Sequence, residues 1–152
     1  MKRGEKRIDP FMVAASIHDL RRSVDMREDS HGLNASKWFL KNKHLFKGLS
    51  KKEIDSIVFA VSHHDIYSNE KILDKEGIKL FNILKAADAL DRFRLPKKEW
   101  WPNQKFISIK LSNKFLEFAK NFVIQTEKDR LAGMDIIEAI IRNGKKYGVI
   151  EK

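Results

Sequence analysis

Cysteine is absent from this sequence of 152 residues. A chain without thiols forms no disulfide and offers no thiolate to a metal ion, which excludes disulfide-stapled secreted domains and cysteine-type zinc sites. The absence of cysteine also agrees with a reducing compartment, so we expect a cytoplasmic protein.

Glycine, proline and long apolar runs are also scarce. The sequence has 7 glycines and 3 prolines, fewer than a turn-rich β fold requires. We expect no membrane span, because no apolar run approaches the roughly 20 residues of a membrane helix, and no secretion signal. A composition of 42% hydrophobic and 34% charged residues is typical of a globular protein. Together these features predict an all-α fold in a single domain over residues 1–152.

Positive charge predominates and is spread along the chain, with a net charge of +10 at pH 7. A basic surface attracts phosphate groups, so a phosphorylated small molecule such as a nucleotide ranks above a neutral substrate. Nucleic acid is compatible with this charge but is less favoured, because the lysines form no long run. The sequence leaves the oligomeric state open and is compatible with a homo-oligomer.

Helix-start signals and apolar periodicity divide the chain into helical segments. Asp9-Pro10 begins the first helix, Ser30 is expected to cap the second, and Ser50 to Glu53 forms a capping box for the third. We expect helices over residues 9–23, 30–42, 50–64, 77–93, 113–131 and 134–142. Asn143-Gly144 is expected to end the last helix, and residues 106–111 are either extended or a lead-in to the next helix.

Imidazole and carboxylate groups recur near the ends of these segments. In chain order they are His18-Asp19, His31 before Gly32, the pair His63-His64, and Asp88 within Ala87-Asp88-Ala89-Leu90-Asp91. Such groups are suitable ligands for a divalent metal ion, which can be Mn, Fe, Mg, Co, Ni or Zn. A bound ion lowers the pKa of its water ligands and neutralises phosphoryl oxygens, the chemistry needed to hydrolyse a phosphate ester.

This ordered series resembles the HD-domain superfamily of metal-dependent phosphohydrolases. The resemblance covers the motif region 9–96, and the helices within 105–145 are expected to pack on it. It implies that His18, Asp19 and Asp88 bind a metal ion, and that His31 and His64 bind a second ion or the phosphate. His63 remains an alternative to His64. Asp19, His31 and Lys85 are the residues we expect to be catalytic.

The family's first metal-binding histidine lies upstream of the His-Asp pair, and this chain has no histidine before His18. Three explanations stay open: an upstream segment supplies the ligand, another group replaces it, or the site is degenerate. We therefore expect either a phosphohydrolase acting on a phosphomonoester or phosphodiester, or a catalytically degenerate module that senses a nucleotide or binds a partner.

Cationic side chains near these motifs are candidates for holding the substrate phosphate. Lys85, Asp88 and Arg92 share one face of a helix, and Arg22 directly follows the His-Asp pair. Arginine can bind phosphate with two parallel hydrogen bonds. The simpler alternatives are that Asp88 pairs with Arg92 or Lys85, and that His18 and His31 are ordinary surface residues at helix ends.

Overall fold

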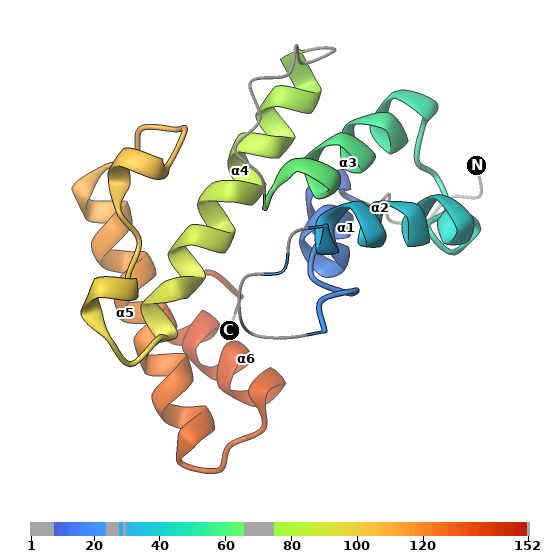
Figure 1. Ribbon diagram of the computed structural model, residues 1–152. Coiled ribbons are helices and arrows are strands. Elements are labelled where there is room, and N and C mark those ends of the chain that lie inside the picture. Colours follow the sequence, from blue (N-terminus) through green and yellow to red (C-terminus); the bar gives the residue numbers. More distant parts are fainter. Residues whose placement is uncertain (1–7, 24–27, 29, 66–74, 152) are drawn as a thin grey trace. The chain divides into compact units, whose positions relative to one another are not determined.

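The computed structural model describes residues 8–23, 28, 30–65 and 75–151. Within these ranges the fold is all-α, as the composition predicts, and contains no strand (Figure 1). The α-helices are α1 (Pro10–Ile17), α2 (His31–Asn42), α3 (Lys51–His63), α4 (Lys75–Asp91), α5 (Asn113–Leu131) and α6 (Ile136–Lys146). The short 3-10 helices are η1 (Lys43–Leu45), η2 (Arg92–Arg94), η3 (Lys98–Trp100) and η4 (Gln104–Phe106).

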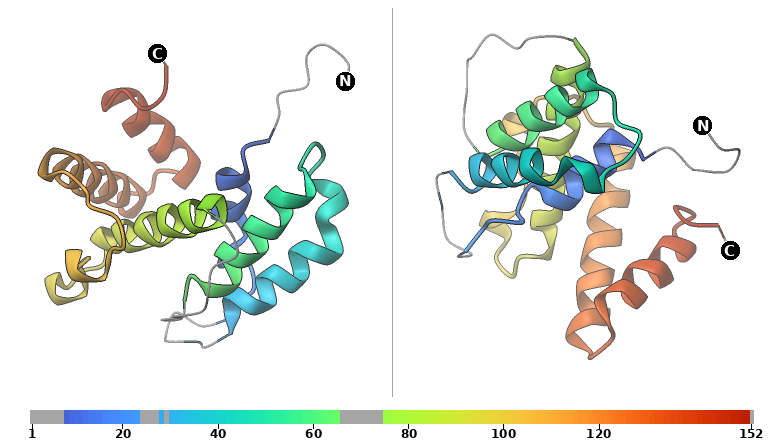
Figure 2. Two further views of the ribbon diagram at one scale, coloured as in Figure 1. Left: turned by 90° about the horizontal axis from the view of Figure 1, so that it is seen from above. Right: turned by 90° about the vertical axis from the view of Figure 1, so that its right-hand side faces the viewer.

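The chain divides into two units, residues 1–85 and residues 86–152. The boundary falls inside α4, so this continuous helix begins in the first unit and ends in the second (Figure 2). The expected packing of the helices within 105–145 on the motif region therefore stays a prediction.

The first unit is built around an apolar core to which α1, α2, α3 and the first part of α4 all contribute. Its buried side chains are Val13, Ala14, Ile17, Ala35, Phe39, Ile57, Ala60, Val61, Leu80, Phe81 and Leu84. They recur at helical spacing, and burying each large one contributes about 1.5–3 kcal/mol. This packing brings the C-terminal ends of α1 and α3 to the N-terminal end of α2, where the histidines lie.

The first helix is shorter than expected. It ends at Ile17 instead of near Ser23, and the next residues form tight turns in which Leu20 N bonds Ile17 O at 3.0 Å and Arg22 N bonds Asp19 O at 2.9 Å. Leu20 is 49% exposed, so extending the helix would bury little further apolar surface. The turn carries His18 and Asp19 out of the helix.

The two predicted caps in the first unit have different outcomes. The capping box is confirmed, since Ser50 Oγ accepts from Glu53 N at 3.3 Å and Glu53 Oε2 accepts from Ser50 N at 2.8 Å. The prediction for Ser30 is wrong, because Ser30 has a φ of 91° and its side chain makes no capping hydrogen bond. Asp65 caps α2 instead by accepting from Gly32 N, 33 residues earlier in the chain, at 3.3 Å.

In the second unit, α5 packs against α6 across a tight turn that contains Gly133, whose φ is +95°. The predicted end of the last helix at Asn143-Gly144 is wrong, since α6 continues to Lys146 and both residues are buried inside it. Asn143 bonds Asp129 of α5, and Gly144 lies so close to Ile150 that a Cβ would meet its Cδ1 at 2.5 Å. Tertiary contacts therefore explain this Asn-Gly pair.

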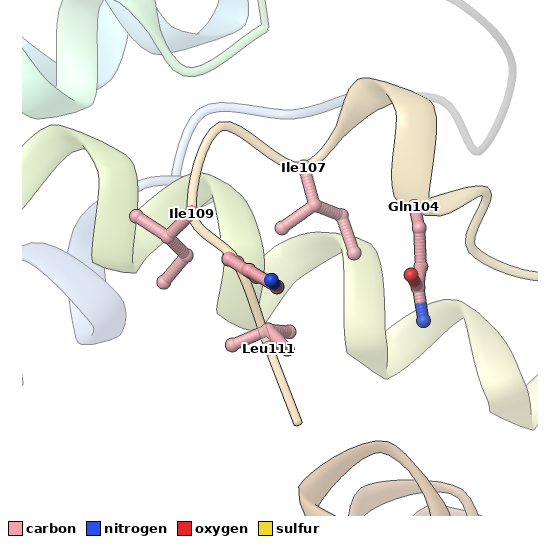
Figure 3. A pocket seen from close by; sticks show the side chains of 5 residues that line it. Gln104, Ile107, Ile109 and Leu111 are labelled. Carbon is pink, nitrogen blue, oxygen red and sulfur yellow. The ribbon is translucent and has the colours of Figure 1, made fainter. Parts of the chain in front are cut away.

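Residues 106–111, which the sequence left open, begin in η4 and continue without regular structure. A hollow of about 260 Å³ lies here in the second unit (Figure 3), and its lining residues are Gln104, Ile107, Ile109, Lys110 and Leu111. This lining contains no imidazole or carboxylate, so the hollow is unsuited to metal chemistry. Among the described residues, none of the helices has the length and apolar character to cross a membrane.

Candidate metal centre

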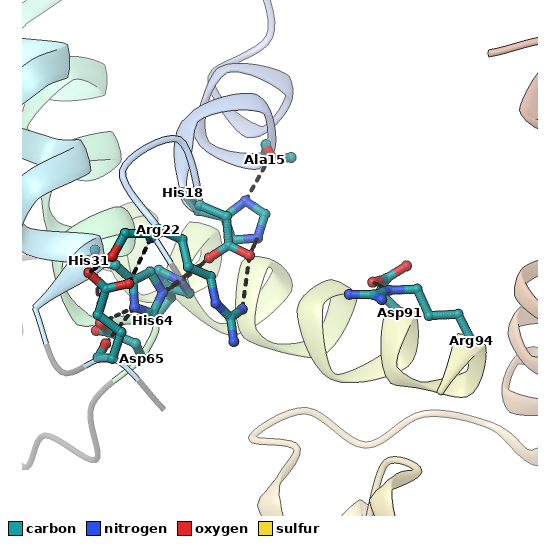
Figure 4. A network of polar contacts seen from close by, with 12 residues as sticks. Ala15, His18, Arg22, His31, His64, Asp65, Asp91 and Arg94 are labelled. Atoms are coloured by element: carbon teal, nitrogen blue, oxygen red, sulfur yellow. Dashed lines mark hydrogen bonds and ion pairs between the residues drawn. The ribbon is translucent and has the colours of Figure 1, made fainter. Parts of the chain in front are cut away.

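Four predicted site residues come together in the first unit, and we call them the histidine cluster: His18, Asp19, His31 and His64 (Figure 4). His31 Nε2 lies 3.1 Å from Asp19 Oδ1 and 3.1 Å from His64 Nε2. His64 Nε2 lies 3.6 Å from the same Asp19 oxygen. His18 joins from the other side, with Nε2 3.7 Å from Asp19 Oδ2.

All three imidazoles of the histidine cluster are held in the same way. Their Nδ1 atoms contact the backbone carbonyl three residues earlier, with His18 to Ala15 O at 2.8 Å, His31 to Glu28 O at 2.7 Å and His64 to Val61 O at 2.7 Å. A carbonyl oxygen only accepts, so each Nδ1 carries a hydrogen, and in the neutral ring each Nε2 then presents a lone pair. Metal-binding histidines are typically fixed by such a bond from the second ring nitrogen.

The donor atoms also have spacings that suit a cation. With both rings in the Nδ1–H form, the Nε2 lone pairs of His31 and His64 face each other at 3.1 Å, which is repulsive unless a proton or cation lies between them. Ligands about 2.1 Å from one ion stand about 3.0 Å apart in octahedral and about 3.4 Å apart in tetrahedral geometry. The triangle of 3.1, 3.1 and 3.6 Å fits either arrangement.

Positive neighbours keep Asp19 ionised. In the metal-free protein a proton on His64 Nε2 can bridge to Asp19, and this hydrogen bond is the largest cause that holds the pKa of Asp19 well below its usual range. The charges of His18 and Arg22 add to the shift, while burial opposes it. Arg22 Nη1 lies 3.2 Å from Asp19 Oδ2. The side chains of Asp19 and Arg22 are 36% and 32% exposed whereas His64 is 2% exposed, so the cluster has a buried base and an open edge.

Gly32 permits the close approach of α2 and α3 at the cluster. A Cβ at this position would lie 2.4 Å from Val61 O and 2.9 Å from His64 Nδ1, both far inside normal contact. Any other residue would push α2 away from α3 and would separate His31 from His64. The glycine after His31 therefore has a packing role that sequence reasoning did not assign.

Sequence reasoning also missed Asp65 and the part played by Glu28. Asp65 lies directly after His64, is 9% exposed, and places Oδ2 3.1 Å from His31 Nδ1. Glu28 contributes its carbonyl to His31, and its side chain accepts from Ser23 N at 2.8 Å. A carboxylate adjoining the His63-His64 pair was the signal that could have drawn attention to Asp65.

His63 and Lys85, two further candidates in the first unit, each contact an aromatic ring. The His63 ring stacks on Phe59 at 4.4 Å between ring centres and its Nδ1 contacts Phe59 O at 2.9 Å, so His64 is the member of the pair in the cluster. Lys85 Nζ lies 5.3 Å from the centre of the Phe81 ring. His44 is exposed.

Asp88 and Arg92 belong to the second unit, so their predicted roles as metal ligand and phosphate ligand stay predictions. Arg92 Nε donates to Trp100 O at 2.8 Å. Asp91, on the same stretch, forms an ion pair of 2.6 Å with Arg94 (Figure 4). That pair lies on exposed side chains of the second unit and ties the end of α4 to η2.

A hollow of about 530 Å³ in the first unit lies at the other ends of the same helices. Its lining includes Pro10 and Phe11 of α1, Ser56 of α3, and Leu80 of α4. No histidine lines it, and the N-terminal parts of α1 and α3 contribute to it whereas the C-terminal ends of these helices carry the cluster. The two features are therefore chemically separate.

Comparison with protein families, with curated proteins and with solved structures gives no significant match for this chain.

Proposed function

We propose that this chain is a divalent-metal-dependent phosphohydrolase of the HD type that cleaves a phosphomonoester or phosphodiester, with a nucleotide as the preferred substrate class. The observation that carries the proposal is the convergence of three Nε2 atoms and the Asp19 carboxylate, with every Nδ1 committed to a backbone carbonyl. The net charge of +10 and a cysteine-free chain support a cytoplasmic enzyme with an anionic substrate.

In this proposal His18, Asp19 and His64 hold the ion, and His31 adds a fourth donor. When bound, the ion supplies a water-derived nucleophile near neutral pH and polarises a phosphoryl oxygen. A donor set of three imidazoles and one carboxylate ranks Zn, Fe, Co, Ni and Mn above Mg, which prefers oxygen ligands. Asp88 remains the proposed additional ligand.

Arg22 is the proposed phosphate-binding residue with the strongest support, because its guanidinium lies 3.2 Å from Asp19 Oδ2, at the open edge of the cluster. Its fork of N–H donors can hold phosphoryl oxygens and neutralise the charge that builds up during cleavage. Lys85 and Arg92 are proposed to steer the phosphate from α4 and η2. The ionised Asp19 orients the Arg22 guanidinium, and it also offers a carboxylate oxygen as a ligand to the metal ion.

The test compares the wild-type protein with Asp19→Ala, using release of phosphate from a panel of nucleotides with Mn²⁺, with Zn²⁺ and with EDTA. We expect release that depends on the metal ion in the wild type and a loss of at least about 100-fold in Asp19→Ala, more than removal of an outer-shell partner costs. Asp55→Ala, which removes an exposed aspartate from α3, is the matched control and should retain activity. Equal release of phosphate by the wild type and Asp19→Ala would reject the proposed phosphohydrolase activity.

A nucleotide-sensing module that needs no metal is the second candidate, because a proton between His31 and His64 also accounts for their 3.1 Å contact. Elemental analysis separates the two functions. The enzyme should retain close to one metal ion per chain. The module should be metal-free and should still show a nucleotide-dependent rise in Tm.

A further inference from the structure

We propose that Asp65 is the positioning residue of the cluster: one of its oxygens holds the His31 ring and the start of α2 so that His31 Nε2 faces the cation site. This inference rests on the metal site of the proposed function but concerns a residue outside the donor set. Asp65 acts through His31 and is not itself proposed to touch metal or substrate.

A single oxygen of Asp65 makes both contacts. Oδ2 lies 3.1 Å from His31 Nδ1 and accepts from Gly32 N at 3.3 Å. The first N–H groups of a helix have no partner within the helix, and Ser30 makes no side-chain capping bond here. Asp65 therefore fixes the first turn of α2 and the first side chain on that turn together.

His31 needs this second support more than the other two histidines. Ala15 and Val61, whose carbonyls hold His18 and His64, lie inside α1 and α3, where helical hydrogen bonds fix the backbone. Glu28, whose carbonyl holds His31, lies outside the helices. The carboxylate at the end of α3 thus gives His31 the fixed acceptor that a helix gives the others.

The second oxygen of Asp65 argues against a purely structural role. Among the described residues Oδ1 is buried without a hydrogen-bond partner, and the side chain is 9% exposed. A buried unpaired oxygen on a charged group destabilises the fold, and an amide would cap Gly32 equally well without that charge. What the carboxylate adds over an amide is a negative charge on the Nδ1 side of His31, which makes the ring a better metal ligand.

The first test measures binding of Zn²⁺ alone and of Mn²⁺ alone to Asp65→Asn, Asp65→Ala and the control Asp55→Asn, which changes an exposed aspartate of α3. We expect affinity about 10-fold weaker for Asp65→Asn and about 100-fold weaker for Asp65→Ala, the range for outer-shell partners. Asp55→Asn should match the wild type. The Tm of metal-free Asp65→Asn should equal or exceed the wild-type value, so a lower Tm with unchanged affinity would overturn the inference.

The second test uses no metal and therefore separates this inference from the proposed function. Nitrogen-15 NMR of the metal-free protein reports whether His31 Nδ1 is protonated and how fast its proton exchanges. We expect a protected Nδ1 proton in the wild type and in Asp55→Asn, and a proton that exchanges faster in Asp65→Ala. If the alanine variant does not fold, the exchange rate of the His31 Nδ1 proton in Asp65→Asn is the deciding measurement. Failure of the wild type to bind either ion would reject the metal site, whereas unchanged His31 signals in the Asp65 variants would reject the positioning role.

Discussion

Each unit of this protein has a partly buried group of polar residues, and the hydrogen-bonding patterns of the two groups are opposite. The first unit has the histidine cluster, and the second has a network of Gln125, Asp129 and Asn143 between α5 and α6, which we call the Asp129 network. Both include a carboxylate whose pKa is lowered by a hydrogen-bonded neighbour. Their comparison separates polar groups that hold a fold from polar groups suited to hold a ligand.

In the Asp129 network donors meet acceptors. Asn143 Nδ2 donates to Asp129 Oδ2 at 2.8 Å and to Ala139 O at 3.0 Å, while Gln125 Nε2 donates to Asp129 Oδ1 at 3.1 Å. Both hydrogens of the Asn143 amide and both oxygens of Asp129 thus have partners. Such a network stabilises the contact between two helices, and its polar groups need no additional ligand.

In the histidine cluster acceptors meet acceptors when the rings are neutral, and the hydrogen bond between His64 and Asp19 forms only with an added proton. The Nδ1 hydrogens all point to backbone carbonyls, so the Nε2 atoms and Asp19 oxygens face one another at 3.1 to 3.7 Å. A shared proton or a cation has to relieve this arrangement. The difference between the two groups is the physical basis for proposing a ligand in the first unit and a structural role in the second.

The largest expected effect comes from Gly32→Ala, which should push α2 away from α3 and separate His31 from His64 in the histidine cluster. The new Cβ would lie 2.4 Å from Val61 O, a backbone atom that cannot move aside easily. We expect a loss of about 3 kcal/mol in the free energy of unfolding, the upper end for overpacking, together with a loss of Zn²⁺ binding. Urea unfolding and a zinc titration measure the two effects.

Gly133→Ala is the control for that substitution, because it forces alanine into a φ of +95° with nothing within 4 Å of the new Cβ. Backbone strain of this kind costs about 1 kcal/mol. Zinc affinity should be unchanged in this variant. Zinc binding by Gly32→Ala that equals the wild-type value would contradict the assigned role of Gly32.

Asn143→Ala should produce the next largest effect, and it should destabilise the second unit without affecting the first. The substitution removes two hydrogen bonds from a side chain that is 1% exposed and leaves Asp129 without its main donor. We expect a loss of about 2 kcal/mol in the free energy of unfolding, since hydrogen bonds to charged groups are worth about 1.5–3 kcal/mol.

Hydrogen exchange locates the effect of Asn143→Ala. Backbone amides of α5 and α6 should exchange faster, whereas amides of α2 and α3 and the affinity for Zn²⁺ should not change. A parallel loss of metal binding would show that the two polar groups are coupled, and the contrast between them would fail.

The smallest expected effect is a pH dependence that Asp19 imposes on the metal-free protein. Its pKa in the folded state is held below its ordinary value of 3.8, so ionised Asp19 stabilises the fold above about pH 4. That contribution should decline as the pH falls below 4 toward the lower pKa of the folded state. Asp19→Asn should lack this part of the acid sensitivity.

The measurement is urea unfolding with EDTA between pH 2 and 5, below the usual pKa of histidine of about 6.5. The difference in free energy of unfolding between wild type and Asp19→Asn isolates Asp19 from Glu127 and Asp129, whose pKa values are also lowered. The same slope in both proteins would mean that Asp19 is not ionised by its neighbours.

Local signals allowed several elements to be predicted closely. Ser50 with Glu53 marked the start of α3, and Ser112 precedes a helix whose bounds of 113–131 match the expectation. These features depend on hydrogen bonds between residues two to four positions apart, which are readable in sequence. The same signals misplaced the end of α6 at Asn143, because a contact with Asp129 overrides the local preference.

The candidate site likewise has residues that the sequence identified and residues that it could not identify. The sequence identified His18, Asp19, His31 and His64 by residue type and by their places at helix ends. It could not identify Asp65 as the partner of His31 and the cap of α2, because that contact joins residues 34 positions apart, nor Gly32 as the point where α2 meets α3.

The sequence by itself therefore determined an all-α protein, the positions of most helices and the chemical kinds of group in its candidate site. Only the tertiary structure decided which histidine of the His63-His64 pair enters the cluster, which way each imidazole faces, and which carboxylate supports it. The physical reason is range: helix signals act over about one turn, whereas a set of converging lone pairs exists only after distant segments have packed.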